Sequence, residues 1–186
     1  MKVKTEDLAR KAAILLGEMP SAMCNGVECE AATLTDYLLT RIEQLAPEAV
    51  TDTPAELVDN YKPLEGNGIT TMEDGSALLP LPDDFLRLHF LRIEGWARPV
   101  TGCYLPESLP AALQSCRCPS LRASASRPVA VLTPADGGRA LRLYGSHSEP
   151  AKIAEGWYLP IPRIDADGFI DMPEASIPIL LNRLKD

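Results

Sequence analysis

Two histidines, His89 and His147, are the residues of this chain best suited to acid–base chemistry near neutral pH. Ser146 precedes His147, but adjacency does not bring a nucleophile and its base together, and the surroundings do not match the G-x-S-x-G turn of serine hydrolases. His89 lies among arginines and apolar residues, which favours a strand side chain. We therefore interpret the chain as a non-enzyme without catalytic residues. A small hydrolase using a Cys/His or Ser/His pair is the alternative.

The sequence patterns most similar to those of known metal sites involve cysteines and aspartates. A zinc site would combine Cys24 and Cys29 with Cys116 and Cys118, but one residue separates the second pair, fewer than structural zinc pairs use. Residues 165–171, DADGFID, echo a calcium loop without its third early oxygen ligand or its late glutamate. We predict free thiols in a reducing compartment, a solvated turn at 165–171, and no metal or cofactor.

Helical patterns occupy both ends of the chain. The first helix is predicted from about Thr5 to Leu16, with Thr5 as its cap and Gly17 as its end. The second is predicted from near residues 33–35 to Ala46, and the residues after Pro47 are compatible with a further turn.

Two shorter helices complete the helical prediction. One follows Thr53, which serves as its cap, and the last covers Ser176–Lys185 with Ser176 as its cap. Pro178 is compatible with this last helix only in its first turn.

Strand patterns fill the middle of the chain. Ile69–Met72 and Ala77–Leu81 flank an Asp-Gly turn, which predicts a hairpin. The alternation that begins at Leu86 changes phase at Phe90, which predicts a bulge or burial on both faces. A second hairpin joins residues 129–133 and 139–145, with the valines of one strand opposite the leucines of the other.

This order of helices, strands and a helix, without regular βαβ alternation, predicts an α+β fold. We expect an antiparallel β-barrel or sandwich inserted between N-terminal helices and a C-terminal helix. The predicted division is a helical part at 1–62, a β-rich part at 63–172, and a returning helix at 173–186.

The net charge of −8 is spread unevenly. Residues 1–75 hold 14 acidic and 6 basic residues, whereas residues 87–142 hold 8 basic and 3 acidic residues. Acidic and basic parts attract each other within one molecule or between neighbours, although a chance run of surface arginines explains the pattern equally well. The basic residues are all arginines: Arg87, Arg92, Arg98, Arg117, Arg122, Arg127, Arg139 and Arg142.

Length and composition narrow the class of protein. A chain of 186 residues with 46% hydrophobic residues is long enough to bury a core without disulfides or metals. No apolar run approaches the length of a membrane span. Glu6 and Asp7 precede the apolar part of the N-terminal segment, unlike a secretory signal, so we expect a cytoplasmic origin.

Several segments resemble the head–tail connector (adaptor or neck) proteins of tailed bacteriophages. The most specific is LPDDFLRL at residues 81–88, which is similar to the "LP-x-DFLRL" wording common in that family. The remaining matching segments are LTDYLLTRIEQLAPEAV at 34–50, RIEGWARPV at 92–100, LRLYG at 141–145 and GWYLPIPRID at 156–165. The resemblance covers about residues 33–186 and leaves out the loops at 20–32 and 115–127.

The resemblance implies a structural ring subunit, made in the bacterial cytoplasm and assembled into the virion neck of a phage or prophage. Its partners would be the portal protein, a tail or neck protein, and further copies of itself, with DNA passing without sequence-specific contact and no membrane involved. The family carries no fixed catalytic or binding residues. The predicted interface residues are Arg87, Arg92, Trp96, Arg98, Arg139 and Arg142.

A stand-alone binding module for a peptide or small ligand is the alternative from another class. It predicts a stable monomer with a concave pocket near Trp96 or Trp157. Both tryptophans are otherwise expected to serve in packing.

Overall fold

The computed structural model describes residues 1–17, 29–65, 68–135, 137–145 and 151–185. The chain divides into two compact units. The helical unit combines Met1–Asn60 with Ile161–Asp186, and the β unit is the continuous segment Tyr61–Pro160. The α+β class and the insertion of an antiparallel β part between helical segments are therefore confirmed.

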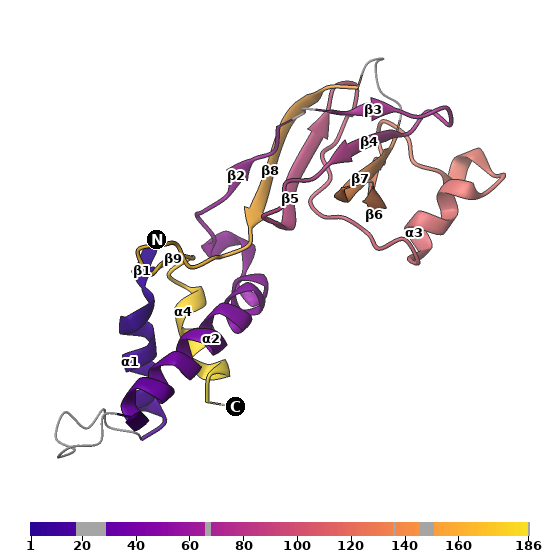
Figure 1. Cartoon of the computed structure of the whole chain (residues 1–186). Helices are drawn as coiled ribbons and strands as arrows, with labels where there is room; N and C mark the ends of the chain where they lie inside the picture. Colours follow the sequence, from indigo (N-terminus) through magenta and orange to yellow (C-terminus); the bar gives the residue numbers. More distant parts are fainter. Residues whose placement is uncertain (18–28, 66–67, 136, 146–150, 186) are drawn as a thin grey trace. The chain divides into compact units, whose positions relative to one another are not determined.

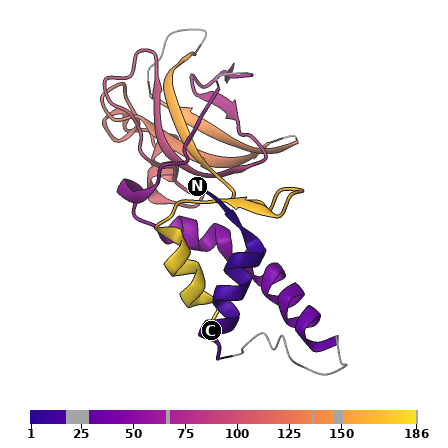
Figure 2. The ribbon, with the colours of Figure 1, turned by 90° about the vertical axis from the view of Figure 1, so that its left-hand side faces the viewer.

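Three helices of the helical unit, α1, α2 and α4, pack against one another (Figure 1, and in a second view Figure 2). Their apolar faces meet in one interior, where Leu8, Leu38, Ile42 and Leu180 are all at most 2% exposed. The described residues of this unit also form two short strands and one 3-10 turn. Their bounds are α1 Thr5–Leu15, α2 Cys29–Asp52, α4 Ser176–Arg183, β1 Lys2–Lys4, β9 Phe169–Asp171 and the turn Ala55–Leu57.

Helix α2 is longer than the sequence pattern indicates. It begins at Cys29, before the predicted start, and continues through Pro47 to Asp52. Proline removes one helical hydrogen bond and normally kinks or ends a helix. Here Ala46, Ala49 and Val50 are fully buried on both sides of the proline, so their packing holds the last turns in place.

Three hydroxyl residues predicted as helix caps have other roles, so those predictions were wrong. Thr5 donates through Oγ1 to the carbonyl oxygen of Gly168 at 2.8 Å. Thr53 donates to the carbonyl oxygen of Ala49 at 2.8 Å, and its Oγ1 lies 2.7 Å from Oγ of Ser176. Thr5 and Ser176 therefore bond to groups that tertiary packing brings close, whereas Thr53 also bonds back to a carbonyl group in the last turns of α2, four residues earlier.

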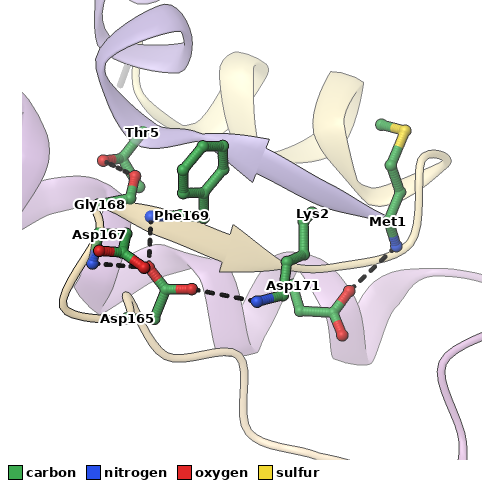
Figure 3. A network of polar contacts seen from close by, with 8 residues as sticks. All are labelled: Met1, Lys2, Thr5, Asp165, Asp167, Gly168, Phe169 and Asp171. Atoms are coloured by element: carbon green, nitrogen blue, oxygen red, sulfur yellow. Dashed lines mark hydrogen bonds and ion pairs between the residues drawn. The ribbon is translucent and has the colours of Figure 1, made fainter.

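The first strand, β1, pairs antiparallel with β9 near the other end of the chain, with Lys2 opposite Asp171. The predicted turn before β9 is present: the carboxylate of Asp165 accepts the backbone N–H groups of Asp167 at 3.1 Å and Phe169 at 2.8 Å (Figure 3). This pairing groups residues 161–172 with the helical unit, whereas the sequence-based division put them in the β-rich part.

Two antiparallel sheets form the β unit. Their strand orders are β2-β8-β5 and β3-β4-β7-β6. Among the described strands, neither sheet closes into a barrel, so the barrel alternative is not supported. The bounds are β2 Lys62–Pro63, β3 Thr70–Thr71, β4 Ala77–Pro80, β5 Phe85–Ile93, α3 Leu109–Ala112, β6 Val129–Ala135, β7 Gly138–Tyr144 and β8 Ile153–Pro160.

Side chains from both sheets share one apolar core. Phe85 and Leu88 of β5 enter it with Leu79 of β4 and Leu141 of β7, each at most 1% exposed. Tyr158 of β8 joins the same core. Two sheets that bury their inner faces against each other form a sandwich, the other predicted arrangement.

The local strand signals were confirmed more fully than the pairing between strands. Gly75 has a φ of +75°, which the predicted turn between β3 and β4 needs, and β5 contains the predicted irregularity, with register shifts at three places. In the second hairpin Val129 opposes Tyr144 and Val131 opposes Arg142, so the predicted valine–leucine pairing was wrong by one residue. Ala130 opposes Leu143 instead, because this register brings the two fully buried side chains together.

None of the helices within the described ranges has the length and apolar character needed to cross a membrane.

Candidate functional site

The segment 81–88, LPDDFLRL, forms the entry to β5. The backbone N–H of Phe85 donates to the carbonyl oxygen of Pro82 at 3.0 Å, which closes a turn ahead of the strand. Phe85 then enters the core, with its ring centroid 5.7 Å from that of Tyr158. The most specific part of the resemblance thus builds the centre of the β unit.

Asp84 of this segment joins two other strands of its sheet. Its Oδ2 lies 2.6 Å from Nζ of Lys62 in β2, and its Oδ1 accepts the hydroxyl of Tyr158 in β8 at 2.8 Å. Burial opposes ionisation of Asp84, but the hydrogen bonds from Lys62 and Tyr158 outweigh it and lower its pKa. Burial, with the hydrogen bond to Asp84, raises the pKa of Tyr158 to about 12. At neutral pH Asp84 is therefore ionised and Tyr158 is protonated, which suits a structural contact better than proton transfer.

A cleft lies beside this contact. Its walls include Leu64, Pro80, Pro82 and Tyr158, with Lys62 at the same place, and its volume is about 440 Å³. Clefts of roughly 300–1,000 Å³ with apolar walls and few polar groups are typical of small-molecule sites. Neither Trp96 nor Trp157 lines it, so the pocket is not at the place that the binding-module alternative predicts.

The structure uses three of the predicted interface arginines for contacts within the β unit. Arg139 donates through Nη2 to the carbonyl oxygen of Phe85 at 2.5 Å, and its guanidinium lies 5.8 Å from the centroid of that ring. Arg142 pairs with Asp74 at 2.7 Å, and Arg92 lies 3.9 Å from Glu155. Hydrogen bonds from Ser76, together with Arg142, lower the pKa of Asp74.

The remaining predicted interface residues differ in exposure. Trp96 is only 5% exposed and Arg87 is half-buried, whereas Arg98 is exposed. The structure therefore makes Trp96 part of the core and leaves Arg98 on the surface. The predicted arginine interface as a whole stays a prediction.

The residues considered for acid–base and metal chemistry are placed as follows. His89 stacks on Tyr61 with 3.9 Å between ring centroids. Ser146, His147 and Cys24 lie outside the described residues. Within the described ranges no three His, Cys, Asp or Glu side chains gather as a metal site would require. Cys103, Cys116 and Cys118 are free thiols, and burial raises the pKa of Cys103.

The structure adds exposed leucines to a part of the arginine run that the sequence already showed. Residues 105–128 leave the sheets as a connection containing α3, and they carry three exposed arginines, Arg117, Arg122 and Arg127, with one acidic residue, Glu107. Exposed leucines accompany them, notably Leu109 at 72% and Leu121 at 49%. We call residues 105–128 the arginine–leucine connection. Leu105, Leu109 and Leu113 recur every four residues, a spacing that predicts one face of a helix, but the exposure of Leu105 and Leu109 was visible only in the structure.

Dividing the charges by unit changes the electrostatic picture. The helical unit has 16 acidic and 8 basic residues, and the β unit has 10 of each. The net charge of −8 therefore belongs to the helical unit, while the β unit is neutral overall.

No known family model matches this sequence, and no curated protein is significantly similar to it.

Proposed function

We propose that the chain is a structural head–tail connector subunit of a phage or prophage, forming a ring between the portal and the tail. In this role it is made in the bacterial cytoplasm and ends in the virion neck. Its partners are the portal protein, a tail or neck protein and neighbouring copies, and DNA passes through the ring without sequence-specific contact.

The observation that carries the proposal is the structural use of the segment 81–88. Phe85 and Leu88 are each 1% exposed in the core shared by both sheets, and Asp84 joins three strands through Lys62 and Tyr158. We expect the residues of such a segment to be retained because they pack the core, not because they catalyse a reaction. This agrees with a family that has no fixed catalytic residues.

The architecture gives further support. Both ends of the chain contribute to one helical unit, and the β unit is inserted between them, as the order of helical and strand patterns predicted. The acidic helical unit also suits a subunit beside DNA, because like charges keep the duplex from adhering to it.

Induction of the source organism tests the proposal. Particles are separated by sedimentation, and the particle fraction is analysed by quantitative mass spectrometry. We expect this chain at a fixed number of copies per particle, alongside a portal protein. If particles with a portal are made while the chain stays only in the soluble fraction, the connector proposal is wrong.

The cleft beside Tyr158 favours a second candidate, a ligand-binding module. Its volume of about 440 Å³ lies in the range of small-molecule sites. This function predicts a monomer whose thermal unfolding temperature rises when a compound from a fragment library binds. A Leu81→Trp variant, which fills the cleft, should abolish that rise.

A further inference from the structure

A second, smaller groove lies within the arginine–leucine connection. Leu109, Leu113 and Leu121 of the connection line it together with Val129 of β6, and its volume is about 180 Å³. Gln114 links two stretches of the connection: its Nε2 donates to the carbonyl oxygen of Pro110 at 2.8 Å, and its Oε1 accepts the backbone N–H of Ala123 at 2.9 Å. The groove is therefore fixed by hydrogen bonds within the connection.

Two arginines border this groove. Arg122 donates through Nε to the carbonyl oxygen of Cys116, and Arg127 donates through Nη2 to the carbonyl oxygen of Ser120, both at 2.6 Å. These bonds position the guanidinium groups without neutralising them, and neither arginine forms an ion pair with a described residue. Each guanidinium keeps further N–H donors for an incoming carboxylate.

Size and charge define what the groove accepts. A volume of about 180 Å³ falls below that of typical small-molecule sites, roughly 300–1,000 Å³, but suits one large side chain. Apolar walls with arginines at the rim are typical of protein interfaces, where an aromatic side chain often serves as the anchor. The complementary partner is an exposed aromatic residue on a segment that also carries carboxylates.

This chain carries such a segment on α2. Tyr37 is 59% exposed, although large aromatic residues of helices usually pack inward. Asp36 precedes it, and Glu43 lies seven residues after Asp36, on the same side of the helix and about 10 Å along its axis. Both carboxylates are exposed, and neither pairs with a described basic residue.

We propose that the groove of the arginine–leucine connection receives Tyr37 of a second copy, with Arg122 and Arg127 facing Asp36 and Glu43 of that copy. The charge of −8 on the helical unit attracts the exposed arginines of the approaching copy. Because the two surfaces differ, the contact is head-to-tail and each copy can bind two neighbours. This inference rests on the proposed ring function and names the contact between its subunits.

Paired charge reversals test this contact in the full-length protein. Sedimentation velocity over a concentration series measures self-association of the unmodified chain, of Arg122→Glu with Arg127→Glu, and of Asp36→Arg with Glu43→Arg. We expect at least tenfold weaker association for each variant alone. An equimolar mixture should recover the unmodified level, because each altered surface then meets one of opposite charge.

Two further variants make the test specific. Tyr37→Ser leaves every charge in place and should also weaken association at least tenfold. Lys11→Glu with Lys152→Glu reverses two exposed charges outside both the groove and α2, and it should associate like the unmodified chain. Tryptophan fluorescence and circular dichroism verify folding of each variant, and recovery in the mixture requires folded partners.

Three results would overturn the inference: a monomeric unmodified chain at every concentration, normal association of either groove or α2 variant, or no recovery in the mixture. The connector proposal fails separately. A chain that associates through this groove but is absent from particles would refute the connector role alone. A particle-bound chain unaffected by the reversals would refute the groove contact alone.

Discussion

Replacing Phe85 by alanine is expected to destabilise the β unit more than any surface change. The side chain is 1% exposed. Its ring stacks on that of Tyr158, with 5.7 Å between centroids, and the guanidinium carbon of Arg139 lies 5.8 Å from the centroid of the Phe85 ring. Truncating a buried phenylalanine costs about 3–5 kcal/mol, because apolar contact is lost and a cavity remains. The cation–π contact adds about 0.5 kcal/mol, whereas the bond from Arg139 to the backbone carbonyl is retained.

We therefore expect a loss of about 4 kcal/mol in the free energy of unfolding, a large share of the roughly 5–15 kcal/mol typical of a folded domain. Intrinsic tryptophan fluorescence during urea unfolding measures it for the correct unit, since both tryptophans, Trp96 and Trp157, belong to Tyr61–Pro160. Leu86→Ala is the matched control on the same strand, and its half-buried side chain should cost far less. A loss below about 1 kcal/mol for Phe85→Ala would refute the assignment of this segment as the centre of the core.

Three other changes probe separate parts of the molecule. Thr53→Val should lower the free energy of unfolding of the helical unit by about 1–3 kcal/mol, because the fully buried Ser176 hydroxyl loses its partner. Adding Ser176→Ala should recover part of that loss, and unfolding followed by far-ultraviolet circular dichroism measures both changes. Gly145→Ala should lower the free energy of unfolding of the β unit by about 1–3 kcal/mol, since φ of Gly145 is +135° and the new Cβ would lie 3.0 Å from Nε1 of Trp96. Tryptophan fluorescence during urea unfolding measures this change, and an unchanged unfolding midpoint would contradict the strained geometry. The folded-state pKa of Asp84 lies below its ordinary value of 3.8, so its stabilising contribution is present above that pH and is lost as the pH falls through the lowered pKa. Asp84→Asn should flatten the acid dependence of unfolding below about pH 4, and an unaltered acid profile would argue against the contact with Lys62 and Tyr158.

Local signals predicted those features whose cause is local. Gly17 ends α1 with a φ of +78°, and Gly75 forms the hairpin turn with a φ of +75°. Only glycine adopts this backbone region without strain, so the residue type alone indicates where the chain turns. The periodicity of apolar residues in α2 predicted a buried stripe of Leu34, Tyr37, Leu38, Ile42 and Leu45; Leu38 and Ile42 are buried, but Tyr37 is 59% exposed, so the prediction was wrong at that residue.

The candidate sites likewise contain parts that local sequence patterns predicted and parts that they did not. Sequence patterns located the segment around Asp84 and Phe85, but not the partners Lys62 and Tyr158, which come from strands far along the chain. The groove lined by Leu109 and Leu121 was not predictable, because these residues are twelve positions apart and line one groove only once the connection has folded, with Gln114 bonded to the backbone of Ala123.

The sequence by itself determined the α+β class, the succession of N-terminal helices, central strands and a C-terminal helix, the turn glycines and the uneven distribution of charge, but not the first strand, β1. Tertiary structure alone decided the pairing of β1 with β9, the register of β6 on β7, and the contacts of the buried Thr5 hydroxyl with Gly168 and of the Thr53 hydroxyl with Ser176. The physical reason is the range of the forces involved. Backbone strain and apolar periodicity act within a few residues, whereas a strand or a buried hydroxyl must find its partner among groups that meet only after the chain has folded.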